Sequence, residues 1–300
     1  MRRGMILFFM LMFEETADKF YARLQARGLT PGMVRQFRNT IRQYYKDKSR
    51  SDLPWRHTRD PYHILVSEIM LQQTQIERVL RKYPVFIKKY PDFGSLARAR
   101  VRTLYSVWKG MGYNRRALAL KNIACIISAA PYHGRLPADA HDLMRLPFVG
   151  QSTAGAVAAF AFGRPAVFIE TNIRRVFIHF FFREKKKVSD REILFLIEKT
   201  LDRKDPRSWY YALMDYGSAL RNLKENPNRK SSRYKKQSPF EGSNRQMRAK
   251  ILRLISDRRN MSVKELAGLV NMPCDKTSEI IDQLCKEGFI KKKGPCVRMG

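Results

Sequence analysis

Cysteine is scarce in this chain of 300 residues. Its few cysteines form no C-x-x-C pair and no spacing typical of a zinc site. The sequence therefore predicts neither a cysteine zinc site nor a disulfide framework, which suits a protein of the reducing cytoplasm. The cysteines are Cys125, Cys274, Cys285 and Cys296.

Acidic residues are also few. The chain has 27 Asp and Glu against 59 Lys and Arg, which gives a formal net charge of +32. The excess is spread along the chain and is not confined to a tail. A globular protein this basic usually binds a polyanion, and nucleic acid is the leading candidate. The alternative is a solvated basic surface without a specific partner.

The apolar run at the N-terminus, Met5–Phe13, is too short to cross a membrane. Glu14 and Glu15 follow it, where a signal peptide would have small residues. We therefore treat residues 1–15 as uninformative. The cysteine usage leads us to expect a cytoplasmic protein, with no membrane as partner. The run is either a buried first helix or a segment upstream of a true start at Met12.

Strand signals are nearly absent from the first 220 residues. Apolar residues recur there with helical spacing, and Gly, Pro and capping residues separate the periodic segments. We therefore predict an all-α body over residues 1–220. The expected helices span 16–45 (with a break at 30–32), 62–71, 76–90, 95–108, 115–129, 140–145, 152–162, 173–182, 190–201 and 209–220.

The chain changes character after this body. Residues 221–244 are polar, basic and broken by Pro and Gly, which indicates a linker or an extended arm. Residues 245–300 then show three short helices and a small hairpin, the pattern of a winged-helix (α+β) module. Such a module can read a major groove, bind a duplex without sequence preference, or contact another protein.

One stretch, from Leu146 to Asn172, combines features of a binding site. Pro147 and Gly150 indicate a tight hairpin, and a helix of small residues follows it. An apolar segment then delivers Glu170, which is either salt-bridged or catalytic. A tight turn before a helix leaves backbone N–H groups unpaired, and these can bind a phosphate directly or through a cation. The alternative for the hairpin is an ordinary turn between two helices.

Five sequence blocks carry a family resemblance. They are, in order, LPWR (Leu53–Arg56), SEIMLQQTQ (Ser67–Gln75), WKGMGYNRRA (Trp108–Ala117), LPFVGQSTAGA (Leu146–Ala156) and ETNIRRV (Glu170–Val176). In this order they resemble the helix–hairpin–helix (HhH-GPD) superfamily of base-excision DNA glycosylases, and within it the adenine glycosylases of the MutY type. The resemblance covers roughly Leu53 to Leu220. It implies a two-lobed helical fold, a monomer, a nucleoid-associated location, and double-stranded DNA containing a mismatch or lesion as partner.

The chemistry of such an enzyme needs two carboxyl groups. Adenine leaves deoxyribose poorly unless its ring is protonated, and the sugar develops oxocarbenium character, so the site needs an acid beside the base and an anion near the sugar. Glu68 matches the family's general acid, which also guides the attacking water. Its predicted helix is mostly apolar, and an apolar surround favours a protonated carboxyl. The alternative for Glu68 is a helix-surface position paired with an arginine.

Glu170 matches the carboxylate that stabilises the sugar cation, a position where the family usually has Asp. Asn172 matches a neighbouring amide that hydrogen-bonds near the flipped nucleotide. The additional methylene of Glu can displace the carboxylate by ~1 Å, which can lower the rate about a hundredfold in a preorganised site. The alternative for Glu170 is a structural carboxylate that caps the following helix or its hairpin.

Other positions match the parts that hold the extruded nucleotide. Gln73 matches the wedge that fills the gap left by the base, Tyr113 an intercalator beside the opposing base, and Arg56 a contact of the adenine pocket. Ser152 stands where bifunctional relatives have the lysine that attacks C1′, so we expect a monofunctional enzyme without an efficient lyase step. Contacts to the DNA backbone are expected from Pro147, Val149, Gly150, Gln151 and Arg174.

Besides Glu170, the sequence departs from the family at three places. Phe148 stands where the first hairpin glycine is usual. A winged-helix module replaces the domain that senses 8-oxoguanine. The cysteine spacing that holds a [4Fe–4S] cluster in many relatives falls on residues that cannot ligate iron, so we expect no cluster and no organic cofactor, with a monovalent cation at the hairpin compatible with the family. These residues are Arg221, Asn228, Ser231 and Gln237.

Three functions are compatible with these features. The leading one is a monofunctional glycosylase that flips a mispaired base, above all adenine, and hydrolyses its N-glycosidic bond. The second is a DNA lesion- or structure-binding protein in which Glu170 has weakened or silenced catalysis. The third is a glycosylase for another base, such as mismatched thymine or a deaminated or alkylated base. A thymine enzyme would have Tyr at position 152, so Ser152 argues against that substrate.

Overall fold

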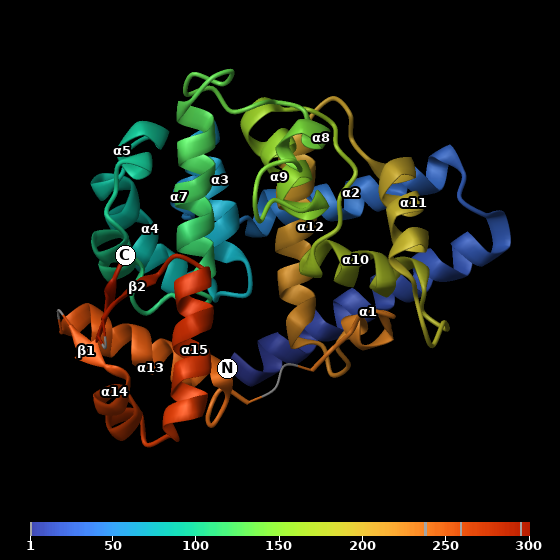
Figure 1. Cartoon of the computed structure of the whole chain (residues 1–300). Helices are drawn as coiled ribbons and strands as arrows, with labels where there is room; N and C mark the ends of the chain where they lie inside the picture. Colours follow the sequence, from blue (N-terminus) through green and yellow to red (C-terminus); the bar gives the residue numbers. More distant parts are fainter. Residues whose placement is uncertain (1, 237–238, 259, 295) are drawn as a thin grey trace. The chain divides into compact units, whose positions relative to one another are not determined.

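The computed structural model describes residues 2–236, 239–258, 260–294 and 296–300. Nearly all of its regular structure is helical, and a small three-stranded sheet lies near the C-terminus, so the predicted fold class is confirmed (Figure 1). The chain divides into two compact units. Unit 1 comprises Met1–Arg59, Ala138–Met144 and Gly150–Lys236, and unit 2 comprises Asp60–Pro137, Arg145–Val149 and Gln237–Gly300.

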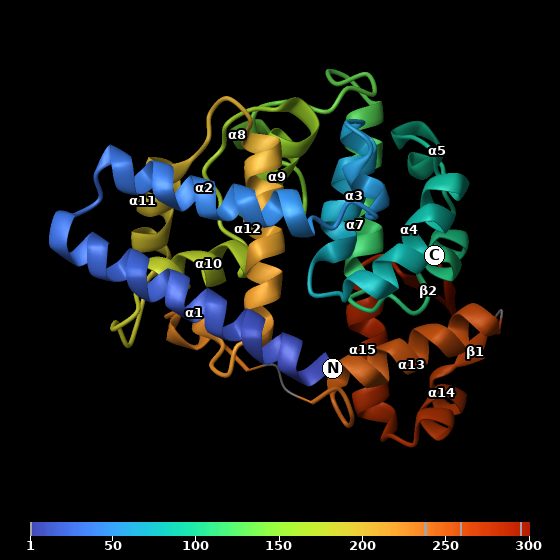
Figure 2. The same cartoon turned by 180° about the vertical axis from the view of Figure 1, so that it is seen from behind.

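Unit 1 is built around α12, which packs against α2 and α10 (Figures 1 and 2). Phe37 of α2 is fully buried, and its ring meets those of Phe177, Phe181 and Trp209 in edge-to-face contacts. Such aromatic pairs add to the free energy gained by burial. The helices of unit 1 are α1 (Arg2–Arg27), α2 (Pro31–Lys48), η1 (Pro54–Arg56), α8 (Ala140–Leu143), α9 (Gln151–Phe162), α10 (Thr171–Phe181), α11 (Asp190–Thr200), α12 (Pro206–Ala219), η2 (Leu220–Asn222) and η3 (Pro227–Lys230).

Unit 2 contains a helical part and the C-terminal module. Its first helices are α3 (Pro61–Leu71), α4 (Ile76–Lys89), α5 (Phe93–Ala97), α6 (Val101–Trp108) and α7 (Arg115–Ser128). The module has α13 (Asn244–Asp257), β1 (Met261–Ser262), α14 (Val263–Val270), α15 (Cys274–Lys286), β2 (Ile290–Lys293) and β3 (Cys296–Met299). The three strands are antiparallel in the order β1-β3-β2, and the β2–β3 hairpin is the wing.

Most helix ends lie close to the predicted ones, with two clear exceptions. The first helix was expected from residue 16, but α1 begins at Arg2, so the apolar run Met5–Phe13 is part of it. The prediction of a single helix over 95–108 was wrong, because α5 ends at Ala97 and α6 begins at Val101. Arg98 closes α5 by donating its backbone N–H to Gly94, and Arg100 is extended, with φ −71° and ψ 138°. An extended residue cannot continue a helix, so the chain turns between the two segments.

The C-terminal module shares its core with the helices of unit 2. Ile255, Ile281 and Phe289 are fully buried in a cluster that also contains Tyr105 of α6 and Leu118 of α7. The module therefore packs against the helical part of its unit and does not form a core separate from it.

The segment predicted as a linker, residues 221–244, is ordered in its first part. Residues up to Lys236 belong to unit 1, where Val188 donates its N–H to the Lys230 carbonyl at 2.8 Å and accepts from the Ser232 N–H at 2.8 Å. Gln237 and Ser238 lie outside the described residues.

Within the described part of the chain, no helix combines the length and apolar character needed to cross a bilayer.

Candidate active site

The segment that leads to Glu170 is held between two helices of unit 1. Phe168 is fully buried, and a Cβ on Gly155 of α9 would lie 2.6 Å from the Phe168 Cβ. From α12, the Tyr210 hydroxyl donates a 2.5 Å hydrogen bond to the Ala166 carbonyl. These contacts fix the apolar run that the sequence predicted to deliver a carboxylate.

Glu170 is the N-cap residue of α10. Its Oε1 accepts the backbone N–H of Asn172 at 2.7 Å and that of Ile173 at 2.9 Å. Burial raises the pKa of Glu170, although the two N–H groups and the charges of Arg175 and Arg174 lower it in part. The capping role named as the alternative is thus present. It uses Oε1, while Oε2 accepts a longer bond, 3.4 Å, from the Asn172 side-chain amide.

Asn172 is fixed from two further sides. Its Oδ1 accepts a 2.9 Å hydrogen bond from Arg175 Nη1, and the same guanidinium donates to the Gly217 carbonyl at 2.5 Å. A Cβ on Gly217 would lie 2.6 Å from the Asn172 carbonyl carbon, so only glycine allows α12 to approach the start of α10 this closely. The structure therefore brings Glu170 and Asn172 together, and Gly217 is a positioning residue that the sequence reading missed.

Glu68 lies on α3, in unit 2, as predicted. Asp60 caps this helix by accepting the His63 N–H at 3.0 Å, and Pro61 occupies the first turn. The flanking residues Ser67 and Ile69 are fully buried, whereas Glu68 is half-buried. A carboxyl in this position is partly desolvated and still reachable.

Gln73 and Tyr113 occupy two exposed loops of unit 2. Both have left-handed backbones, with φ 52° and 45°, a conformation that is uncommon for non-glycine residues and enriched at functional sites. The 36% exposed side chain of Tyr113 accepts a 3.0 Å hydrogen bond from Arg245 Nη1. Exposed, conformationally constrained side chains suit the predicted wedge and intercalator.

The buried Arg116 joins these two loops. Its Nη1 donates to the Gln72 carbonyl at 2.5 Å, and its Nη2 donates to Thr74 Oγ1 at 2.9 Å and to the Gly112 carbonyl at 3.0 Å. Burial lowers the pKa of Arg116 to about 10, so it stays charged at neutral pH. The sequence reading missed this residue, whose only local signal is the Arg-Arg pair in the WKGMGYNRRA block.

The hairpin is formed as predicted. The Val149 N–H donates to the Leu146 carbonyl at 3.2 Å, and Gly150 is the extended N-cap of α9. Phe148 has φ +63° and is 45% exposed, and the Arg115 guanidinium lies 5.3 Å from its ring centroid. This left-handed backbone explains why a glycine is usual at position 148 in the family that the sequence resembles. The flanking Pro147 is half-buried, Val149 is buried and Gln151 is exposed.

We expect Phe148→Gly to be more stable than Phe148→Ala by about 1 kcal/mol, because a left-handed backbone costs about 1–2 kcal/mol for a residue with a Cβ and little for glycine. Both substitutions remove the aromatic ring, so their difference isolates the backbone conformation. Urea unfolding of the two variants measures it. The reverse order, which is normal in an ordinary helix, would show that the hairpin does not have this conformation.

Two arginines with predicted DNA roles make ion pairs inside unit 1. Arg56 forms a buried bidentate salt bridge with Asp215, in which both N–O distances are 2.7 Å. Burial alone would raise the pKa of Asp215, but Arg56 and Arg50 hold it below its usual range. Arg174 Nη2 lies 3.0 Å from both carboxylate oxygens of Asp190. Their contacts to the base pocket and DNA backbone stay predictions, as does the role of the half-buried Ser152 in the first turn of α9.

The segment where relatives hold an iron–sulfur cluster is organised here by hydrogen bonds. Asn228 Nδ2 donates to the Thr171 carbonyl at 3.0 Å, and Oγ of the buried Ser231 accepts the Arg233 N–H at 3.2 Å. Amide and hydroxyl groups engaged in this way do not fit an iron–sulfur cluster. In the described ranges, no group of three or more His, Cys, Asp and Glu could hold a metal ion. Gln237, the last position of the spacing, lies outside the described residues.

Comparison with known proteins agrees with this geometry. Residues 66–202 match the family model of the HhH-GPD superfamily of base excision DNA repair proteins, and residues 246–294 match that of the MarR family. The thymine/uracil-DNA glycosylase of Methanothermobacter thermautotrophicus is 32% identical over 187 residues, which are 61% of this chain and 84% of that protein. The chain belongs to the HhH-GPD superfamily of base excision DNA repair proteins.

Adenine enzymes are also among the relatives. The adenine DNA glycosylase of Buchnera aphidicola subsp. Baizongia pistaciae is 34% identical over 195 residues, which are 64% of this chain and 54% of that protein. The chain thus spans about half the length of the curated adenine glycosylases it matches. The solved structure of a thermostable thymine-DNA glycosylase superposes with a TM-score of 0.56 at 28% identity and covers 65% of this chain and 90% of its own.

Proposed function

We propose that this protein is a monofunctional DNA glycosylase that removes a mispaired base, above all adenine, from double-stranded DNA. The observation that carries the proposal is the carboxylate–amide pair of Glu170 and Asn172, held at the start of α10 by Gly217. The ETNIRRV block that contains it resembles the family's catalytic segment, and adenine enzymes are among the relatives.

The two carboxyl groups have different tasks in this proposal. Glu68, half-buried on a mostly buried helix, donates a proton to the flipped base and then orients the attacking water. Glu170 stabilises the sugar cation through its Oε2 side, since Oε1 is engaged by two backbone N–H groups. Asn172 hydrogen-bonds beside the flipped nucleotide.

A second candidate is a glycosylase for mismatched thymine or uracil. The chain covers 84% of the thymine/uracil-DNA glycosylase of Methanothermobacter thermautotrophicus, and the thymine-DNA glycosylase structure has the same fold. We favour adenine because the resemblance assigns a tyrosine to position 152 of thymine enzymes, whereas this chain has Ser152.

The protein is also proposed to work without an iron–sulfur cluster. Asn228 and Ser231 occupy two ligand positions of the cluster spacing, and their side chains take part in hydrogen bonds to Thr171 and Arg233. The segment still supports the active site, because Asn228 bonds to Thr171, the residue that follows Glu170. The purified protein should be colourless, and absorbance near 400 nm from bound iron would contradict this proposal.

A panel of duplexes tests the proposed activity. It contains A opposite G, A opposite 8-oxoguanine, T opposite G, uracil and hypoxanthine, and the products are treated with alkali. We expect strand scission at an adenine mispair only after alkali, because Ser152 cannot form the imine of a lyase. Scission at thymine or uracil alone would establish the second candidate. Binding without scission of any duplex would overturn the proposal in favour of a catalytically silent DNA-binding protein.

Glu170→Asp is expected to retain or raise the excision rate. Asp is among the preferred N-cap residues, and its shorter side chain matches the residue usual in the family. The free energy of unfolding should change by less than about 1 kcal/mol, while the control Glu170→Ala should lose about 1 kcal/mol with the cap and most of its activity. Single-turnover rates and urea unfolding provide both readouts. Complete inactivity of Glu170→Asp with intact DNA binding would show that Glu170 does not stabilise the sugar.

A further inference from the structure

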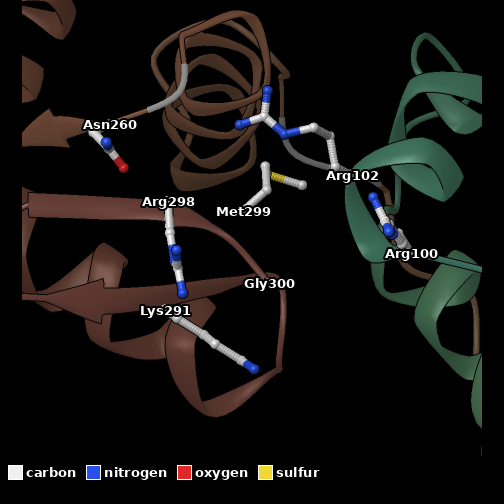
Figure 3. Close-up of a pocket in the computed structure, with 7 residues that line it drawn as sticks. All are labelled: Arg100, Arg102, Asn260, Lys291, Arg298, Met299 and Gly300. Atoms are coloured by element: carbon white, nitrogen blue, oxygen red, sulfur yellow. The ribbon is translucent and has the colours of Figure 1, made fainter.

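A basic cavity of about 690 Å³ lies in unit 2 beside the wing (Figure 3). Arg100 and Arg102, at the start of α6, line it from one side, and Lys291 and Arg298, on strands β2 and β3, line it from the other. Of the lining side chains that the structure describes, none is Asp or Glu. None of these residues has a role in the proposed excision chemistry.

The cations of this cavity lack the partners that other cations of the module have. Lys292 Nζ lies 2.6 Å from Asp282 Oδ1, and Arg248 Nη2 lies 2.5 Å from Glu287 Oε2. Within the described part of the chain, no ion pair contains any of the four lining cations. These four residues are Arg100, Arg102, Lys291 and Arg298. Their positive charge is therefore available to an external anion.

The backbone places two of these cations directly opposite each other. Lys291 and Arg298 are partners in the β2–β3 register, so their side chains project from the same face of the wing. Like charges at directly opposed positions destabilise a pair of strands. Arg102 is anchored from the other side, since its Nη1 donates to the Ser256 carbonyl at 3.0 Å. The repulsion between Lys291 and Arg298 is relieved when a polyanion binds between them and neutralises their charges.

The helix that a winged-helix protein would place in the major groove, α15, has no excess of cations. It carries Asp275, Glu279 and the half-buried Asp282 against two exposed lysines, Lys276 and Lys286. DNA phosphates repel carboxylates, so α15 is poorly suited to enter a groove. The favourable surface for DNA is therefore the wing together with the start of α6.

We propose that the cavity binds the phosphate backbone of duplex DNA, so that the wing and the start of α6 form the DNA-contacting surface of the module. The inference rests on the proposed function for the identity of the duplex, which is the DNA that flanks the mispaired base. A phosphate backbone offers dense negative charge and hydrogen-bond acceptors, as a cationic lining requires. Small-molecule sites are instead lined mainly by apolar side chains, and here Met299 is the one apolar side chain among the described lining residues.

The test compares two triple variants of the full chain. The first is Arg100→Ala with Lys291→Ala and Arg298→Ala, which removes three exposed cations of the cavity. The control is Lys264→Ala with Lys276→Ala and Lys286→Ala, which removes three cations of α14 and α15. Both variants lose the same charge, and all six substituted side chains are exposed, so circular dichroism should show the wild-type fold in both. Fluorescence anisotropy measures binding to an undamaged duplex over a range of salt concentrations.

We expect the cavity variant to bind the duplex at least roughly tenfold more weakly than the control. Its plot of log affinity against log salt should be shallower by about 0.9 for each phosphate that the variant no longer neutralises. Equal affinities of the two variants, or a larger loss in the control, would overturn the proposal. So would unchanged duplex binding combined with a loss of thermal stabilisation by inorganic pyrophosphate, which would indicate a small-anion site. Because the duplex is undamaged, these outcomes do not depend on whether the protein excises any base.

Discussion

Glu68→Gln is expected to abolish base excision while leaving the protein folded and able to bind DNA. Gln has nearly the shape of Glu, so the half-buried position on α3 keeps its packing. It cannot donate a carboxyl proton to the base or accept one from water. General acid–base catalysis by one side chain contributes roughly 10²–10⁴-fold, and here one residue serves both proton transfers, so the loss should lie at the upper end of that range.

Single-turnover excision and anisotropy on the same mismatched duplex separate chemistry from binding. The matched control is Glu198→Gln on α11, where the side chain is 59% exposed and lies 3.8 Å from Arg203. This control should excise at the wild-type rate. A Glu68→Gln enzyme that retains more than roughly a tenth of that rate would show that another group protonates the base, and the assignment of Glu68 would fail.

Gly217→Ala is expected to reduce both stability and activity. A Cβ at this position would lie 2.6 Å from the carbonyl carbon of Asn172, and this neighbour is backbone, which cannot rotate away. Over-packing of this kind typically costs about 1–3 kcal/mol. To relieve it, α12 and the start of α10 must separate, which moves Glu170 and Asn172 together. A displacement of ~1 Å can lower a rate about a hundredfold.

The same substitution at Gly268 of α14 is the control. A Cβ there meets nothing within 4 Å, so Gly268→Ala should stabilise the helix by about 0.5–1 kcal/mol without affecting excision. Urea unfolding and single-turnover rates of both variants give the comparison. If Gly217→Ala unfolds like the wild type and remains active, α12 does not hold the start of α10 in the manner described.

Features with local signals were predictable from the sequence. Gly163 ends α9 with φ +63°, and Thr30 caps α2 through its hydroxyl, which accepts the Met33 N–H at 3.3 Å. The capping box of Ser189 and Glu192 likewise starts α11. In each case, the residues that determine the helix end lie within one turn of it.

The supporting contacts of the candidate site could not be predicted in this way. Arg116 donates to the Ile69 carbonyl, which lies 47 residues earlier in the last turn of α3, and to the carbonyls of Met70 and Gln72. Gly217 has a low helix propensity, so its place within α12 has no local explanation. The explanation is tertiary, because a side chain there would collide with the backbone of Asn172. Position 170 shows the same limit. The sequence suggests both a cap and a catalytic group, and the structure adds that the cap uses Oε1 while Oε2 accepts a longer bond from Asn172.

The shared core of unit 2 determines what a shortened chain would expose. Tyr105 and Leu118 are buried partly by the side chains of the C-terminal module, among them Ile255 and Phe289. Removal of residues 245–300 would uncover these apolar groups on α6 and α7, which also frame the loop of Tyr113. The module and the helices that carry this loop are thus expected to unfold in a single cooperative transition. A chain without the module would be less stable and would aggregate through the apolar surface exposed on α6 and α7.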